Sequence, residues 1–237
     1  MSRELMDLAA AAAHVHVDAN ELKHAAQRGE IESVKRGEAW FFEHRVLDEW
    51  AQRNLLASSK KEIGAVHREM SDDFRRRKKT GFSIADLFPA SGITLDLAAK
   101  AKAGAIRDMT DLAIATGLVY DDEGLYAELV AREDAAPTAV GKGVAFLHPR
   151  YHDPYFFEET FIAYGRAVKP VFFGGPDGEA TRHFFLIGST DHEAHLHILA
   201  RLAVLAHGTD LVERLDAAAT GQDVVDAVRA CEEEFVK

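Results

Sequence analysis

The stretch GKGVAFLHPR, residues 141–150, decides the fold that we expect for this chain of 237 residues. Its apolar run from Ala145 to Leu147 is typical of a buried strand. The run ends in a histidine, His148, and Pro149 follows directly. Because a proline biases the residue before it towards extended backbone, we expect His148 to keep the direction of the strand at its end.

Helical and strand-like segments alternate around this stretch from Phe82 onward, which predicts an α/β domain. The amphipathic helix 95–119 is expected to be interrupted near Gly104. The expected helices span 95–119, 121–134, 190–208, 210–220 and 221–237, and the expected strands span 143–148, 167–174 and 182–189. Thr190 and Glu193 have capping-box spacing, which would start the third of these helices, 190–208, close to His195.

Charge and proline divide the chain near Gly81. Residues 1–80 carry 15 Lys and Arg against 14 Asp and Glu, a net of +1, so the remainder carries the other 13 basic and 25 acidic residues, a net of -12. All six prolines lie at or after Pro89. This asymmetry predicts two domains, residues 1–54 and 82–237, joined by a helical and basic linker, residues 55–81.

The second domain resembles the fructose/mannitol-type enzyme IIA domains of the bacterial phosphotransferase system, which include the nitrogen-regulatory IIA proteins. The matching residues, in order, are Arg132, Glu133, Thr138, Gly141, Gly143, Ala145, His148, His195 and Leu196. The resemblance implies a mixed sheet with helices packed on it. At one position the chain departs from the pattern, because Leu147 stands where the family has a proline.

The resemblance also implies roles for these residues. His148 would accept a phosphoryl group from an HPr-like phosphocarrier protein, since a largely neutral imidazole is nucleophilic near pH 7. Arg132 would donate to the phosphoryl oxygens, and His195 would hydrogen-bond the acceptor or the phosphoryl group. The family pattern adds Thr138, Gly141 and Gly143 as supporting residues of the phosphoryl site.

Two other interpretations of these histidines stay open. His148 could be vestigial, in an unphosphorylated protein that uses the IIA fold to bind partners. His192, His195 and His197 could instead suggest a metal site, but His197 points away from the helix face that the other two share. Because neither a cysteine pair nor a carboxylate pattern accompanies them, we expect no metal and no cofactor.

Residues 1–54 resemble the excisionase-type, MerR-like winged helix-turn-helix family. The segment from Glu4 is expected to form an Ala-rich first helix, Asp18 to cap the second helix, and Gly29 to close it. A hairpin is expected around Lys35 to Gly37. The resemblance implies that the second helix and the hairpin face DNA through Lys23, His24, Gln27, Arg28, Lys35 and Arg36.

The function that we expect is that of a bacterial regulator in which phosphorylation of the IIA-like domain is coupled to a DNA-binding-like module. A protein-interaction use of the N-terminal fold and a phosphocarrier for a sugar permease are the alternatives. A homodimer would accompany DNA binding. No apolar run reaches the roughly 20 residues that a membrane helix needs, and the single Cys231 gives no disulfide framework. We therefore expect a cytoplasmic protein.

Overall fold

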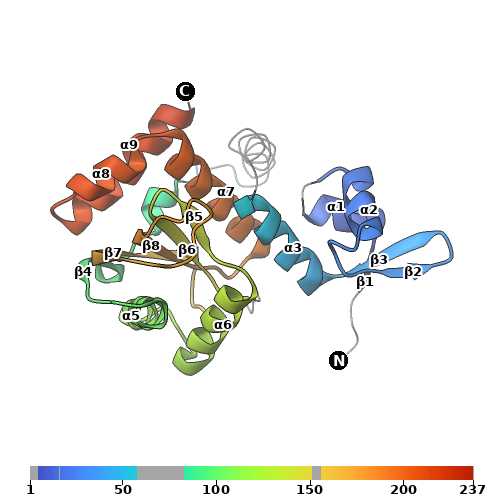
Figure 1. Ribbon diagram of the computed structural model, residues 1–237, viewed down its shortest axis with the longest axis horizontal. Helices are drawn as coiled ribbons and strands as arrows, with labels where there is room; N and C mark the ends of the chain where they lie inside the picture. Colours follow the sequence, from blue (N-terminus) through green and yellow to red (C-terminus); the bar gives the residue numbers. More distant parts are fainter. Residues whose placement is uncertain (1–4, 16, 58–82, 151–155, 237) are drawn as a thin grey trace.

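The computed structural model describes residues 5–15, 17–57, 83–150 and 156–236, and its chain forms two parts joined through one helix (Figure 1). Residues 58–81 of the expected linker, with the basic run Arg75 to Lys79, lie outside the described residues. In the described part of the chain, no helix combines the length and the apolar character needed to cross a membrane.

The N-terminal part is a three-stranded antiparallel sheet with two helices packed together beside it. Its elements are β1 (Leu5–Asp7), α1 (Leu8–His14), α2 (Ala19–Gln27), β2 (Val34–Arg36), β3 (Ala39–Glu43) and α3 (His44–Ala57), with strand order β1-β3-β2. The expected hairpin is confirmed as β2–β3. The prediction of helix from Glu4 is wrong at residues 5–7, because they pair with β3 as a strand and Asp7 caps the helix after them.

Local capping explains where the second helix begins and ends. The carboxylate of Asp18 accepts hydrogen bonds from the backbone N–H groups of Asn20, at 2.8 Å, and Glu21, at 3.4 Å. Gly29 then takes a positive φ of 73°, which few residues other than glycine adopt easily, and the helix stops. Both sequence-based expectations for α2 are therefore confirmed.

The C-terminal part is built on a five-stranded mixed sheet, as expected. The strands are β4 (Ile93–Leu97), β5 (Ala139–Gly141), β6 (Val144–Leu147), β7 (Phe161–Val171) and β8 (Thr181–Gly188), in the order β4-β7-β8-β6-β5. β4 is parallel to β7 and β6 is parallel to β8, whereas the other two pairings are antiparallel. The expected helix start at Leu95 is wrong, because residues 93–97 pair with β7 instead.

Helices cover both faces of this sheet. α5 (Lys102–Ile114) and α6 (Asp122–Ala135) share one apolar cluster with alternate strand residues, while α7 (His192–Gly208), α8 (Leu211–Ala217) and α9 (Gly221–Val236) share the other cluster. Two short 3-10 turns, η1 (Ile84–Leu87) and η2 (Ala90–Gly92), precede β4. In β6, Val144 and Phe146 belong to the α7 side, and Ala145 and Leu147 to the α5 side. This alternation is the period-2 pattern of a strand buried on both faces.

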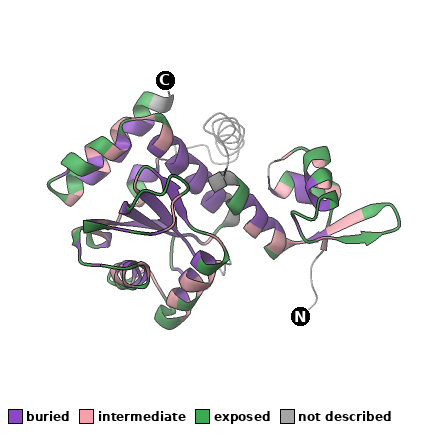
Figure 2. Ribbon diagram, viewed as in Figure 1, coloured by how far each residue is buried: buried purple, intermediate pink, exposed green. Residues whose placement is uncertain are grey.

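Helix α3 joins the two parts. It starts directly after β3 and packs along α7, and its buried Leu47, Trp50 and Ala51 belong to the same apolar cluster as α7. Figure 2 shows buried positions on α3 as well as along most of α7. The N-terminal part is therefore held against the helix that follows β8 and carries His195.

Candidate functional site

His148 follows the last residue of β6, and its position in the alternation directs it to the α7 face of the sheet. Phe146, two residues earlier, lies in the apolar cluster on that face. The imidazole of His148 is completely buried, and its Nδ1 lies 3.1 Å from the carbonyl oxygen of Pro149. Because a carbonyl oxygen only accepts, Nδ1 carries a proton and donates it, and in the neutral form of the ring the lone pair is then on Nε2.

The structure brings His148 and His195 together, as the resemblance implies. His195 lies in the first turn of α7, where its backbone N–H donates to the carbonyl oxygen of Asp191 at 3.0 Å. The two rings meet edge to face, with centroids 5.0 Å apart and planes inclined by 62°, and both are fully buried. The expected capping by Glu193 stays a prediction, because that side chain lies outside the described residues.

Arg132 lies near the end of α6 and is almost fully buried. Its Nη1 donates to the carbonyl oxygen of Ala136 at 2.8 Å, which satisfies one carbonyl after the helix end. Burial lowers the pKa of its guanidinium, and the carboxylates of Glu133 and Glu49 oppose this effect. An arginine keeps its charge in such an environment, so Arg132 contributes a buried positive charge.

Hydrogen bonds between Glu133 and Thr138 hold the segment that leads from α6 into β5. One carboxylate oxygen of Glu133 accepts hydrogen bonds from the backbone N–H of Thr138, at 2.9 Å, and from its hydroxyl, at 2.6 Å. The other oxygen accepts from Nζ of Lys102 at 2.7 Å. The hydroxyl of Thr138 is therefore a hydrogen-bond donor to the buried Glu133 carboxylate.

The two glycines of the motif lie in the β5–β6 turn, at the opposite end of β6 from His148. Gly141 and Gly143 have φ angles of 93° and 71°, and Lys142 between them also has a positive φ, of 51°. A Cβ on Gly141 would lie 2.9 Å from the Asp177 carboxylate, which accepts from the backbone N–H of Lys142. His148 is five positions after Gly143 along this extended segment, a span of roughly 16 Å. The two glycines therefore lie next to Asp177 and far from the imidazole of His148.

Helix α3 reaches the His148 end of the sheet, which nothing in the local sequence indicates. Glu49 accepts hydrogen bonds from Nη2 and Nε of Arg150, at 3.1 and 3.3 Å. Arg150 is the second residue after His148, and both Glu49 and Arg53 act electrostatically on Arg132. A carboxylate from the N-terminal part therefore lies among the positive charges of Arg150, Arg132 and Arg53.

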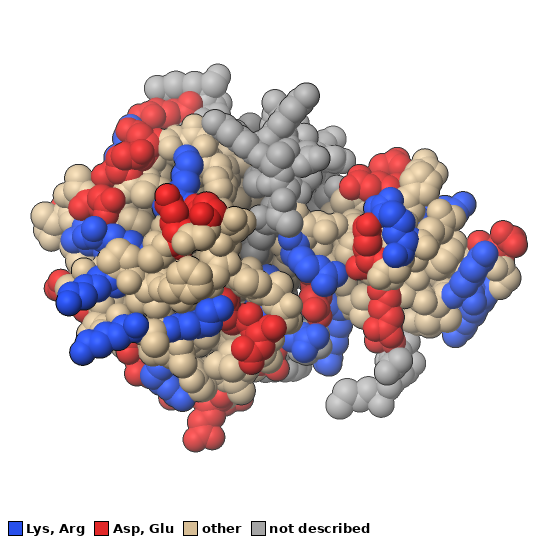
Figure 3. Space-filling view, viewed as in Figure 1, with Lys and Arg blue, Asp and Glu red and all other residues tan. Residues whose placement is uncertain are grey.

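The residues expected to face DNA lie on α2 and on the β2–β3 hairpin. His24, Gln27, Arg28, Lys35 and Arg36 are exposed and Lys23 is partly buried. Arg28 is paired with Glu30, Nη2 to Oε2 2.8 Å, while Lys35 and Arg36 lie over the rings of Trp40 and Phe41. Figure 3 shows acidic and basic side chains interspersed over this part of the molecule.

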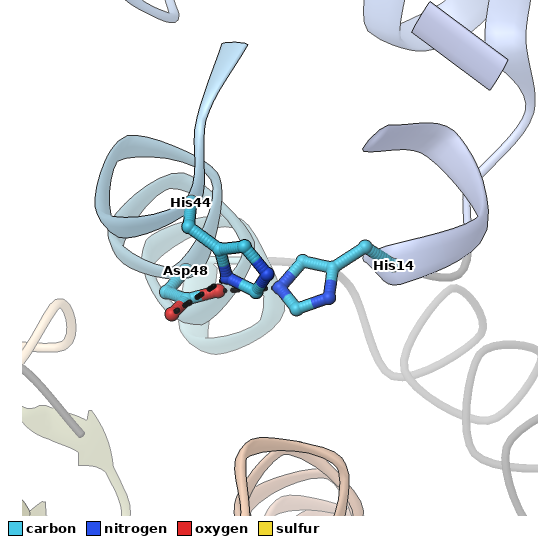
Figure 4. Close-up of side chains that lie close together, drawn as sticks. All are labelled: His14, His44 and Asp48. Carbon is cyan, nitrogen blue, oxygen red and sulfur yellow. Dashed lines mark hydrogen bonds and ion pairs between the residues drawn. The ribbon is translucent and has the colours of Figure 1, made fainter. Parts of the chain in front are cut away.

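A second group of titratable side chains lies between α1 and α3. Among the residues that the structure describes, His14, His44 and Asp48 are the group whose ligand atoms are close enough to share a cation, all within 4.8 Å of one another (Figure 4). The sequence-based expectation weighed the histidines of α7 for a metal and did not consider this group. His44 and Asp48 have helical i,i+4 spacing, but their approach to His14 depends on tertiary packing.

Comparison with known proteins identifies the family of the C-terminal part. Residues 86–231, more than half of the chain, match the family described as phosphoenolpyruvate-dependent sugar phosphotransferase system, EIIA 2. The fructose-specific EIIA component of Haloferax volcanii is 29% identical over 147 residues, which cover 61% of this chain and 94% of that protein. The nitrogen regulatory protein of Bradyrhizobium diazoefficiens is 28% identical over 144 residues, 60% of this chain and 91% of that protein.

A solved structure supports the fold. The complex of mannitol enzyme IIA and phosphorylated mannitol enzyme IIB from Escherichia coli matches with a TM-score of 0.52 and 20% identity, covering 60% of this chain and 96% of that one. Each of these three proteins thus aligns to about three fifths of the chain, and the family match begins only at residue 86.

Proposed function

Because the chain belongs to the EIIA 2 family of the phosphoenolpyruvate-dependent sugar phosphotransferase system, we propose that its IIA domain accepts a phosphoryl group on Nε2 of His148. One observation carries the proposal: Nδ1 of His148 is held 3.1 Å from the Pro149 carbonyl oxygen, which fixes the tautomer with the lone pair on Nε2. A positioned, neutral imidazole is what an attack on phosphorus requires.

In the proposed step, the lone pair on Nε2 of His148 forms a bond to the phosphorus of a phosphohistidine on the HPr-like phosphocarrier. The phosphorus–nitrogen bond in the donor breaks as the new bond forms, and the donor nitrogen keeps that electron pair. The proton on Nδ1 of His148 stays in its hydrogen bond to Pro149. Such a transfer needs in-line positioning and positive charge near the equatorial oxygens rather than further covalent chemistry.

Three residues would supply that environment. The ring of His195, 5.0 Å away between centroids, would hydrogen-bond a phosphoryl oxygen. Arg132 and Arg150 would supply positive charge, Arg132 from its buried position near the end of α6. Thr138 acts more indirectly, since it holds the Glu133 carboxylate next to Arg132.

We propose that α3 couples this site to the N-terminal part. His148 is fully buried, so a donor protein reaches its Nε2 only after the surrounding segments move. Glu49, on α3, pairs with Arg150. A phosphoryl group on His148 would compete with the Glu49 carboxylate for the same positive charges. Displacement of Glu49 would then weaken the packing of α3 on α7, which is the signal that the N-terminal part receives.

For the N-terminal part we propose DNA binding through α2 and the β2–β3 hairpin. The order of elements, with a helix pair followed by a hairpin bearing exposed Lys35 and Arg36, supports a winged helix-turn-helix module that would act as a homodimer. The charge favours the alternative of a protein partner, since residues 1–54 carry seven Lys and Arg against ten Asp and Glu, a net of -3.

The phosphoacceptor proposal is tested with the full chain, phosphoenolpyruvate, enzyme I and the phosphocarrier protein from the same source. Intact mass is expected to increase by one acid-labile phosphoryl group in the wild type and in His24→Ala, which removes an exposed imidazole from α2. His148→Ala is expected to show no increase. An equal increase in His148→Ala, or none in the wild type, would leave the unphosphorylated interaction protein as the function.

A third candidate, a phosphocarrier for a sugar permease, makes a different prediction. In that case the phosphoryl group on His148 would pass to a IIB protein, so adding the IIB proteins of the same source would remove the mass increase within minutes. A regulator is expected to keep its phosphoryl group under the same conditions. The burial of His148 beneath neighbouring segments favours the regulator, because a carrier must exchange phosphoryl groups with two partners in every cycle.

A further inference from the structure

We propose that His14, His44 and Asp48 form a binding site for a divalent transition metal ion of the zinc class. His14 is the last residue of α1, and His44 and Asp48 lie on the first two turns of α3. Figure 4 shows the two rings and the carboxylate directed towards one another from these two helices. The ligand atoms of the three side chains lie within 4.8 Å of one another.

The donor set is one that zinc binds in proteins. Two imidazole nitrogens and one carboxylate oxygen give three ligands, and zinc sites with three protein ligands complete a tetrahedron with water. Imidazole together with carboxylate suits Zn²⁺ and its neighbours in the first transition row, whereas Mg²⁺ and Ca²⁺ prefer oxygen alone. The side chains of this site therefore favour ions of the zinc class over Mg²⁺ and Ca²⁺.

The distances require only small shifts of the ligand atoms around the ion. Donor atoms about 2.1 Å from a tetrahedral zinc lie about 3.4 Å apart. Nε2 of His14 is already 2.7 Å from one oxygen of Asp48, and Nδ1 of His44 is 4.0 Å from the other. The first pair would move apart and the ring of His44 would move closer; the His44 side chain is 45% exposed, so it has room to rotate.

Burial gives the site a closed side and an open side. The side chains of His14 and Asp48 are 15% and 11% exposed, so packing already fixes two of the three ligands. His44 lies at the solvent boundary, where an ion would enter and where the water ligand would remain. The two rings are in edge contact, with centroids 4.1 Å apart, and each also lies near the Asp48 carboxylate.

Metal binding would exchange a proton for the ion. Since a carboxylate oxygen accepts, Nε2 of His14 carries the proton of its 2.7 Å hydrogen bond to Asp48. The ion would bind the lone pair on Nε2, and the displaced proton would go to solvent or to Nδ1 of the same ring. Bound metal would tie α1 to α3 at the residue next to Glu49, and this consequence does not depend on phosphorylation of His148.

Titration calorimetry with chelator-treated full-length protein tests the site. ZnCl₂ is expected to bind the wild type and His24→Gln with one equivalent site each, and MgCl₂ to give no heat of binding. His44→Gln and Asp48→Asn are each expected to weaken zinc binding by about tenfold or more, the size of effect known for loss of a supporting group at a metal site. Co²⁺, titrated in the same proteins, is expected to give visible absorption that His44→Gln changes.

His44→Gln is the deciding variant, because its side chain is nearly half exposed and its loss should not unfold the chain. Its thermal midpoint without metal is measured to establish this. Weakened zinc binding with an unchanged midpoint supports the site. Zinc affinity equal to that of His24→Gln, or no zinc binding in the wild type, would overturn it and leave His14, His44 and Asp48 as a hydrogen-bonded contact between two helices.

Discussion

Glu49 and Arg150 are 101 positions apart in the sequence, yet the Glu49 carboxylate accepts two hydrogen bonds from the Arg150 guanidinium, the shorter at 3.1 Å. The pair connects the first helix after the small sheet to the segment that follows the buried His148. Partly exposed pairs of this kind contribute about 0.2–1 kcal/mol. That range is small enough for an incoming phosphoryl group to displace the carboxylate.

Replacement of Glu49 should therefore speed phosphorylation. Glu49→Gln removes the charge that competes for Arg150, and we expect the rate of phosphoryl transfer to His148 to rise about two- to fivefold. The rate is followed by intact mass with a fixed concentration of the phosphocarrier. Glu38→Gln is the matched control, because it removes the same charge from the exposed turn of the hairpin. An unchanged or lower rate in Glu49→Gln would contradict the coupling.

Substitution of His195 should slow the transfer without unfolding the chain. In enzymes, loss of a hydrogen-bond donor at a developing negative charge lowers the rate about 100-fold, and a fall of at least tenfold in the rate of transfer is expected here. The amide nitrogen of Gln stands near the position of Nε2 and that of Asn near Nδ1, so comparison of His195→Gln with His195→Asn identifies the nitrogen in use. Wild-type rates in both variants would show that the ring contact to His148 serves packing alone.

The proposed DNA contact predicts a change in salt dependence. If Lys35 and Arg36 each neutralise a phosphate, the double variant Lys35→Ala/Arg36→Ala should reduce the slope of log affinity against log salt by about two. Fluorescence anisotropy with genomic fragments measures this slope. Lys100→Ala/Lys169→Ala removes two exposed charges from the IIA part and should leave it unchanged. Equal slopes in the two double variants would favour a protein partner for the N-terminal part.

Local sequence was enough to predict β6 and the end of that strand. The apolar run before His148 and the capping residues Asp18 and Gly29 act within a few positions, so their effects can be seen without tertiary structure. The mixed α/β fold and the membership of the IIA family are confirmed. The winged helix-turn-helix assignment of residues 1–54 stays a prediction.

Strands that depend on pairing with distant parts of the chain could not be predicted from local sequence. Residues 95–97 have the composition of a helix, but they form part of β4 because β7, some 70 positions later, supplies the hydrogen-bonding edge. The expected strand at 167–174 likewise misses the buried first half of β7, which pairs with β8. The pairing of Glu49 with Arg150 depends on packing between the two parts of the chain, and the contact of the buried His148 with His195 depends on packing of α7 on the sheet. Neither can be seen in the periodicity of the sequence.

A buried carboxylate anchors the start of the IIA part, and its removal should be costly. Glu232 on α9 pairs with Arg201 of α7 at 3.0 Å and accepts from the backbone N–H groups of Ile84 and Ala85. Glu232→Ala would leave the Arg201 guanidinium buried without this partner, and we expect the free energy of unfolding to fall by about 3–5 kcal/mol. Denaturant unfolding measures this loss.

The neighbouring position gives the control for Glu232. Glu233 is exposed on the same helix, and Glu233→Ala should change the free energy of unfolding by no more than about 0.5 kcal/mol. Similar losses in the two variants would mean that helix propensity rather than the buried pair accounts for the effect.

His183 on β8 makes the stability of the IIA part depend on pH. Burial lowers the pKa of its imidazole to about 4, although the carboxylate of Asp216 opposes the shift. The neutral ring shares a 2.8 Å hydrogen bond between its Nδ1 and the hydroxyl of Tyr164. Its ordinary pKa is about 6.5, so below that pH the unfolded chain binds a proton that the folded chain does not.

The contribution of His183 is therefore fully present above about pH 6.5 and is lost as the pH falls towards 4, by about 3 kcal/mol in all. Denaturant unfolding of the wild type between about pH 7 and pH 4.5 should show this loss on top of that due to carboxylates. His183→Gln should give a flatter profile, whereas His24→Gln, which removes an exposed ring, should follow the wild type. Parallel profiles for the wild type and His183→Gln would mean that the buried ring takes up its proton in the folded chain as readily as in the unfolded one.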